Sequence, residues 1–85
     1  MKIVEIYTSP FCGYCHAAKG LLKSKSVSFQ EVDISGKPQL RSQMMARANG
    51  NHTVPQILIG GIHIGGCDEL HALENSGKLD SMLAA

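Results

Sequence analysis

The sequence contains no tryptophan, and only 5% of its 85 residues are aromatic. It also lacks a charge bias, because eight Lys and Arg residues stand against seven Asp and Glu residues, and the basic residues form no run. A nucleic-acid or polyanion partner is therefore not expected, since such partners are bound by clustered positive charge. No stretch approaches the roughly 20 apolar residues of a membrane span, so no membrane association is expected either.

Cysteine is also scarce, and the three cysteines are an odd number. A secreted framework of disulfides is therefore not favoured, and a reducing, cytoplasmic location fits better. The first residues, 1–5, lead directly into a strand-like pattern without the features of a signal peptide. A hydrophobic content of 44% is typical of a globular protein, and the length predicts one domain over residues 1–85.

Apolar periodicity predicts an α/β fold. A strand, a helix and a second strand within about thirty residues are typical of a βαβ unit with parallel strands. Gly60-Gly61, between two short apolar runs, indicates a hairpin. The order β-α-β-α-β-β-α, with a short terminal helix, predicts a four-stranded sheet with two helices on one face and the C-terminal helix on the other. The expected strands cover residues 3–7, 27–34, 56–59 and 62–64, and the helices 13–23, 38–48, 68–75 and 79–83.

The chemistry is centred on Cys12 and Cys15, which stand three residues apart between the first strand and the first helix. At this spacing both cysteines lie on one helix face and can form a disulfide with little backbone movement. The unpaired N–H groups and the dipole at the start of the helix favour a thiolate at Cys12. Cys12 is therefore the expected nucleophile, and Cys15 the residue that resolves a mixed disulfide.

A zinc site is the alternative interpretation of this pair. Zinc takes four ligands, commonly as two close pairs, and Cys67 with His71 could supply the second pair. The redox interpretation is favoured, because the alternating strands and helices between the two pairs can build a core without metal.

A second informative region is distant in sequence. Proline at position 55 enters a strand, and a cis bond before it would expose the backbone N–H and C=O of Val54 for pairing with an extended peptide. The run Gly65-Gly66-Cys67-Asp68 precedes a helix, whose N-terminus is suited to a carboxylate. Together with Cys12, these stretches predict a peptide-sized groove beside a reactive thiolate.

These motifs together resemble the glutaredoxin family, in particular its small bacterial-type dithiol members. Thioredoxins, in contrast, carry Trp and Pro where this chain has Phe11 and Tyr14. The resemblance implies a thioredoxin-like fold and a glutathione-dependent thiol–disulfide oxidoreductase. The stretches that carry it are Tyr7-Thr8, Cys12-Gly13-Tyr14-Cys15, Thr53-Val54-Pro55-Gln56 and Gly65-Gly66-Cys67-Asp68.

The resemblance also implies roles for individual residues. Cys12 would attack a protein–glutathione mixed disulfide, and either a second glutathione or Cys15 would then release the adduct. Pro55 corresponds to the family's cis-proline. Glutathione would be bound by Tyr14, Thr53, Val54, Pro55, Gly66, Cys67 and Asp68.

Departures from the family pattern leave a second function open. Gly13 stands where dithiol members usually carry proline, and some members with a small residue there bind a [2Fe–2S] cluster between two subunits. The chain is accordingly expected to be a monomer, or a dimer only when a cluster is bound. Ser9 replaces a common lysine, for which Arg47 or His52 could substitute, and Glu69 replaces a common aspartate.

Overall fold

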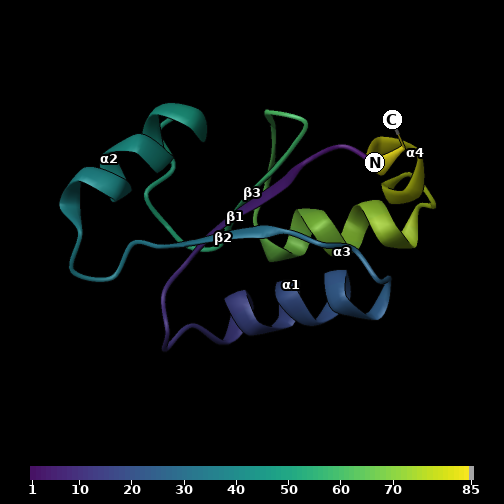
Figure 1. Ribbon diagram of the computed structural model, residues 1–85, viewed down its shortest axis with the longest axis horizontal. Coiled ribbons are helices and arrows are strands. Elements are labelled where there is room, and N and C mark those ends of the chain that lie inside the picture. The colour runs from purple at the N-terminus through teal and green to yellow at the C-terminus, as the bar shows by residue number, and fades with distance from the viewer. Residues whose placement is uncertain (85) are drawn as a thin grey trace.

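The computed structural model describes residues 1–84, so Ala85, at the end of the expected domain, lies outside the described residues. The described chain forms four strands and four helices in the expected order (Figure 1). The strands are β1 (Val4–Thr8), β2 (Gln30–Asp33), β3 (Gln56–Ile59) and β4 (Ile62–Gly65). The helices are α1 (Gly13–Ser24), α2 (Pro38–Arg47), α3 (Cys67–Asn75) and α4 (Leu79–Leu83).

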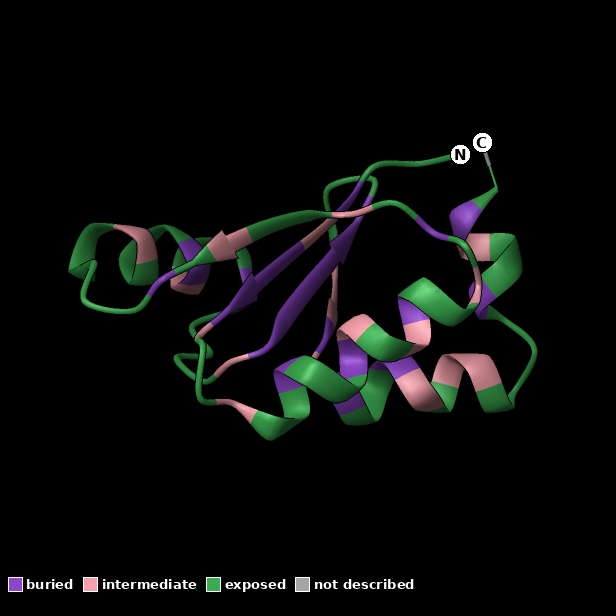
Figure 2. Cartoon of the chain, turned by 60° about the horizontal axis from the view of Figure 1, so that its bottom comes forward, coloured by how far each residue is buried: buried purple, intermediate pink, exposed green. Residues whose placement is uncertain are grey.

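The strands form one mixed sheet in the order β2-β1-β3-β4. β1 and β2 are parallel, as the βαβ pattern predicted, whereas β1–β3 and β3–β4 are antiparallel. The predicted hairpin between β3 and β4 is confirmed, with φ of 58° at Gly60 and 81° at Gly61. Glycine suits both positions, because other residues rarely adopt positive φ. Figure 2 shows that the central strands are the most deeply buried part of the sheet.

The sheet is covered on both faces, but not by the expected helices. α1 and α3 lie together on one face, where their apolar residues pack with Ile6 and Ile57 (Figure 1). α2 covers the other face, where Met44 packs with Tyr7 and Leu58. The expectation that the C-terminal helix would stand alone on its face is therefore wrong. Neighbouring strand residues point to opposite faces, so the sequence shows two apolar faces without assigning a helix to either.

The second strand begins later than its apolar pattern predicted. Val27 is buried, yet its N–H donates to the carbonyl of Leu22 at 2.9 Å and so ends helix α1 instead of pairing with β1. Ser26 makes this turn with φ of 58°. The side chain of Val27 thus enters the core from a helix terminus, and the strand ladder begins at Gln30.

The two ends of the described chain lie side by side (Figure 1). The N–H of Lys2 donates to the carbonyl of Leu83 at 2.9 Å, and Leu79 and Leu83 bury the inner face of α4 in the core. The short last helix thus closes the sheet face that α1 and α3 cover. Within residues 1–84, no helix has the length and apolar character needed to cross a membrane.

Candidate active site

Cys12 is the residue that caps helix α1. Its backbone is extended, with φ of −114° and ψ of 108°, and its sulfur accepts the backbone N–H of Cys15 at 3.1 Å. The first N–H groups of a helix have no partner inside the helix and carry partial positive charge. Cys12 is partly exposed, and its sulfur receives one of these N–H groups.

Cys15 lies one turn further along α1, in a different environment. Its side chain is completely buried, and both cysteines are free thiols. Burial, together with the neighbouring Cys12, raises the pKa of Cys15 to about 12. The expected division of labour between the two thiols thus has a physical basis, because one is accessible and the other is held protonated in the interior.

The loop before β3 meets the Cys12 sulfur at the same end of the sheet, because Gln56 at the start of β3 pairs with Tyr7 near the end of β1. The carbonyl oxygen of Val54 lies 3.7 Å from the Cys12 sulfur, which donates to it as a thiol. The Val54–Pro55 peptide bond is cis, as expected from the resemblance. Two segments that are separated by about 40 residues therefore meet at the nucleophile.

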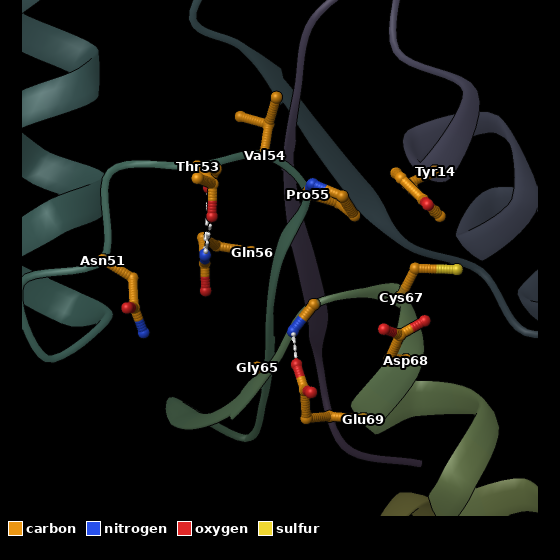
Figure 3. Close-up of a pocket in the computed structure, with 11 residues that line it drawn as sticks. Tyr14, Asn51, Thr53, Val54, Pro55, Gln56, Gly65, Cys67, Asp68 and Glu69 are labelled. Atoms are coloured by element: carbon orange, nitrogen blue, oxygen red, sulfur yellow. Dashed lines mark hydrogen bonds between the residues drawn. The ribbon is translucent and has the colours of Figure 1, made fainter.

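A groove of about 400 Å³ lies beside this meeting point. Its volume is in the range of small-molecule sites. Figure 3 shows Tyr14 and Cys67 at one end of the groove and Asn51 at the other. The groove includes all seven residues expected to bind glutathione: Tyr14, Thr53, Val54, Pro55, Gly66, Cys67 and Asp68. The groove is also lined by four residues that were not predicted to bind glutathione: Asn51, Gln56, Gly65 and Glu69.

The N-terminus of α3 forms one wall of the groove. Glu69 turns back and accepts the N–H of Gly66 at 2.6 Å, as the dashed line in Figure 3 shows. This carboxylate therefore caps its own helix, whereas the carboxylate of Asp68 is exposed at the groove. A Glu three residues after the cap position is a known helix-start pattern, so this contact could have been read from the sequence.

Cys67 is buried at the start of the same helix. Burial raises the pKa of its thiol, and the nearby Asp68 carboxylate raises it further. Its sulfur lies 3.4 Å from Nδ1 of His71, which also lies 2.9 Å from the Cys67 carbonyl oxygen. These properties fit a small residue that packs in the core and presents its backbone to the groove.

The structure does not support the zinc alternative. Among the described residues, no group of three or more His, Cys, Asp or Glu side chains is arranged to hold a metal ion. The two pairs that zinc would need, Cys12 with Cys15 and Cys67 with His71, therefore do not form one ligand set. Cys15, one of the four ligands that this alternative needs, is completely buried.

The loop that carries Val54 is fixed by contacts that the sequence did not reveal. Arg41 of α2 donates to the carbonyl of His52, and Gln56 donates to the carbonyl of Thr53 at 2.9 Å. Arg47, one of the two residues that could substitute for the missing lysine, forms a two-bond ion pair with Glu5 at 2.8 Å. That pair lies on the sheet and holds the pKa of Glu5 below its usual value, chiefly through the hydrogen bonds from Arg47.

The fold and the site together define a class of protein. A mixed sheet flanked by helices, with two cysteines at the junction of its first strand and first helix, is typical of thiol–disulfide oxidoreductases with a thioredoxin-like fold. Comparison with known proteins narrows the class. The glutaredoxin family model matches residues 4–64. Glutaredoxin from Pseudomonas aeruginosa is 56% identical over 85 residues, which cover all of both chains. The chain therefore belongs to the glutaredoxin family.

Solved structures agree with this assignment. The solution structure of glutaredoxin from Brucella melitensis is 54% identical with a TM-score of 0.85, over 98% of this chain and 89% of that one. A buckwheat glutaredoxin–glutathione complex is 29% identical with a TM-score of 0.87, over 96% and 76% of the two chains. A further solved structure, whose subject is the metal binding of glutaredoxins, is 53% identical with a TM-score of 0.74. The match covers 98% of this chain and 89% of that one.

Proposed function

We propose that this chain is a glutathione-dependent thiol–disulfide oxidoreductase that reduces protein–glutathione mixed disulfides and protein disulfides. The observation that carries the proposal is the position of the Cys12 sulfur, between the N–H of Cys15 and the carbonyl of Val54. The N–H of Cys15 can donate to a thiolate at this position, and Val54 offers a backbone edge beside it on which a thiol-bearing peptide can bind.

The first reaction is thiol–disulfide exchange at Cys12. The Cys12 thiolate attacks the glutathione sulfur of the mixed disulfide, a new S–S bond forms to glutathione, and the protein thiolate leaves with the electron pair. The thiolate of a second glutathione then attacks the glutathione sulfur of the adduct. Cys12 leaves as a thiolate, and glutathione disulfide is released. The net reaction converts a glutathionylated protein and glutathione into a protein thiol and glutathione disulfide.

Protein disulfides require Cys15 as well. Cys12 first forms a mixed disulfide with one substrate sulfur, and Cys15 then loses its proton and attacks Cys12, which releases the reduced substrate. Two glutathione molecules reduce the resulting Cys12–Cys15 disulfide. Because its thiol is completely buried, Cys15 is less accessible than the thiol of free glutathione, which favours the route through glutathione.

Glutathione is proposed to bind along the groove in an extended conformation. Its cysteinyl part pairs with the backbone of Val54, and its sulfur reaches Cys12. Its γ-glutamyl carboxylate accepts from the first-turn N–H groups of α3 at Cys67 and Asp68, while the Asp68 carboxylate attracts the amine. Tyr14, which is 68% exposed, flanks the glycyl end. The buckwheat relative, solved as a glutathione complex, supports this choice of ligand.

The proposed setting is the reducing cytoplasm, where glutathione keeps cysteine thiols reduced. The proposed partners are glutathione and disulfide-containing or glutathionylated proteins, with the chain acting as a monomer in one domain.

A second candidate function is the binding of a [2Fe–2S] cluster. A Cβ built on Gly13 would have no atom within 4 Å, so the surface beside Cys12 is open to a bulky group. Because Cys15 is buried, one chain offers a single accessible thiolate at this site, whereas such a cluster needs four ligands. Two copies of Cys12 and two glutathione thiolates would complete the set. An absorption spectrum after anaerobic purification tests this function, and a colourless protein that resists reconstitution excludes it.

Turnover of a glutathionylated peptide, coupled to glutathione, tests the main proposal. We expect Cys12→Ser to lose activity at least a hundredfold and Cys15→Ser to retain it within a fewfold. Activity in Cys12→Ser, or an inactive wild type, would contradict the proposal.

A further inference from the structure

A chain of polar side chains runs along the α2 side of the sheet and ends at the loop that carries Val54. Asn49 lies 3.2 Å from Nδ1 of His63, and Nε2 of His63 lies 2.6 Å from Oε1 of Gln56. The amide nitrogen of Gln56 then donates to the carbonyl and the hydroxyl of Thr53 at 2.9 and 3.3 Å. Figure 3 shows this last link, which spans the base of the loop.

The direction of these hydrogen bonds is fixed by the carbonyl group of Thr53. A carbonyl oxygen only accepts, so the amide NH₂ of Gln56 must face Thr53, and the amide oxygen must face His63. The nitrogen of His63 that points toward Gln56 must therefore carry a proton. His63 thus holds the Gln56 amide in the orientation in which it can donate to the loop.

Gln56 depends on these partners because it is almost completely buried, with 3% of its surface exposed. A buried amide that loses a partner finds no water to replace it and tends to reorient or to shift its neighbours. Asn51, His52 and Thr53, in contrast, are exposed. The hydrogen bonds that hold this segment come from Gln56 and Arg41, and from the N–H of Asn51 to the carbonyl of Ala48 at 3.0 Å.

We propose that His63 is a positioning residue for glutathione binding. Through Gln56 it holds Thr53, and with it the backbone of Val54, in the conformation that pairs with the cysteinyl part of glutathione. The inference rests on the proposed function, because the pairing of glutathione with the backbone of Val54 is part of that proposal. His63 itself lies outside the groove and is not among the expected site residues.

Two substitutions at His63 separate hydrogen bonding from packing. His63→Phe keeps the aromatic volume but removes the donor, whereas His63→Gln keeps an amide N–H near the position of Nε2. With a glutathionylated peptide as substrate, we expect His63→Phe to raise KM about three- to tenfold, the loss of roughly one hydrogen bond. We expect kcat to stay within twofold and His63→Gln to restore most of the affinity.

A matched control and a second readout make the outcome decisive. Ile62→Ala changes an exposed neighbour on the same strand and should leave KM within twofold. Alkylation of Cys12 by iodoacetamide, which does not need the groove, should proceed at the wild-type rate in all three variants. An equal rise of KM in His63→Gln or Ile62→Ala would overturn the inference, because it would indicate general loosening of the sheet edge.

A measurement without substrate distinguishes failure of this inference from failure of the proposed function. The ¹⁵N order parameter of Val54 should fall in His63→Phe and stay at the wild-type value in His63→Gln. An unchanged order parameter in His63→Phe would overturn the positioning role. An inactive wild-type protein whose loop still responds to His63→Phe would instead contradict the proposed function alone.

Discussion

Cys15 donates its backbone N–H to the sulfur of Cys12 across 3.1 Å, while its own sulfur is completely buried. One residue therefore donates a hydrogen bond to the nucleophile with its backbone and withholds its side chain from solvent. This relationship separates the two thiols by environment, although they stand one helical turn apart in the same motif.

The burial of Cys15 predicts a loss of stability at high pH. Below pH 9 the thiol is protonated in both the folded and the unfolded chain. Between pH 9 and 12 the unfolded chain loses this proton while the folded chain retains it, so the free energy of unfolding falls as pH rises. The slope reaches about 1.4 kcal/mol per pH unit. Denaturant unfolding at a series of pH values measures it.

Cys15→Ala is the control for this prediction, because it removes the titrating group and leaves the other thiols and the tyrosines in place. The variant is expected to be less stable at neutral pH but to lose less stability than wild type between pH 9 and 11. Parallel pH profiles for the two proteins would contradict a buried, protonated Cys15.

Gly65 is predicted to tolerate no side chain. It has φ of 117°, and a Cβ there would lie 2.6 Å from Oε1 of Glu69, the atom that caps helix α3. Gly65→Ala should therefore lower the free energy of unfolding by about 1–3 kcal/mol and weaken binding of glutathione at the groove. Urea unfolding and the KM for a glutathionylated peptide test these two effects.

Gly20→Ala is the matched control for the glycine at position 65. Gly20 lies on the exposed side of helix α1, and a Cβ there would have no atom within 4 Å. Alanine at that position is expected to raise stability by up to about 1 kcal/mol and to leave KM unchanged. Equal stability of Gly65→Ala and Gly20→Ala would contradict the prediction, because it would show that neither the backbone conformation nor Glu69 restricts position 65.

The ion pair between Arg47 and Glu5 is predicted to stabilise the fold in a pH-dependent way. The hydrogen bonds from Arg47 lower the pKa of Glu5, so their contribution is present above pH 4.5 and is lost as pH falls through the folded pKa. Arg47→Met should cost about 1 kcal/mol near pH 7, and the difference from wild type should shrink in acid. A difference that stays constant from pH 7 to pH 3 would show that packing, and not charge, links α2 to the sheet.

Much of the fold could be predicted because individual residues constrain the backbone locally. Pro38 begins α2, where its missing N–H does no harm, and Gly60-Gly61 makes the turn between β3 and β4. The parallel pairing of β1 with β2 followed from the strand–helix–strand pattern. The assignment of helices to faces was wrong, because the alternation of Ile57 and Leu58 shows two apolar faces without saying which helix covers each.

The candidate site was partly predictable for the same reason. The sequence indicated Cys12, Cys15 and the start of α3, since each has a local signature, whereas the cis bond before Pro55 was expected from the resemblance. It could not indicate Arg41, which donates to the carbonyl of His52, or His63, which contacts Gln56, because these contacts form only after α2 and β4 pack against the sheet. An arginine on a helix and a histidine on an edge strand have no local pattern that distinguishes them from ordinary surface residues.

The central claim is that Cys12 exchanges directly with glutathione. The most direct measurement is acid-quenched mass spectrometry of the reduced Cys15→Ser protein after mixing with a glutathionylated peptide. The account predicts one glutathione per chain, attached to Cys12, and its removal when free glutathione is added. Attachment to Cys67, transfer of the peptide to Cys12 in place of glutathione, or an unmodified chain would contradict it.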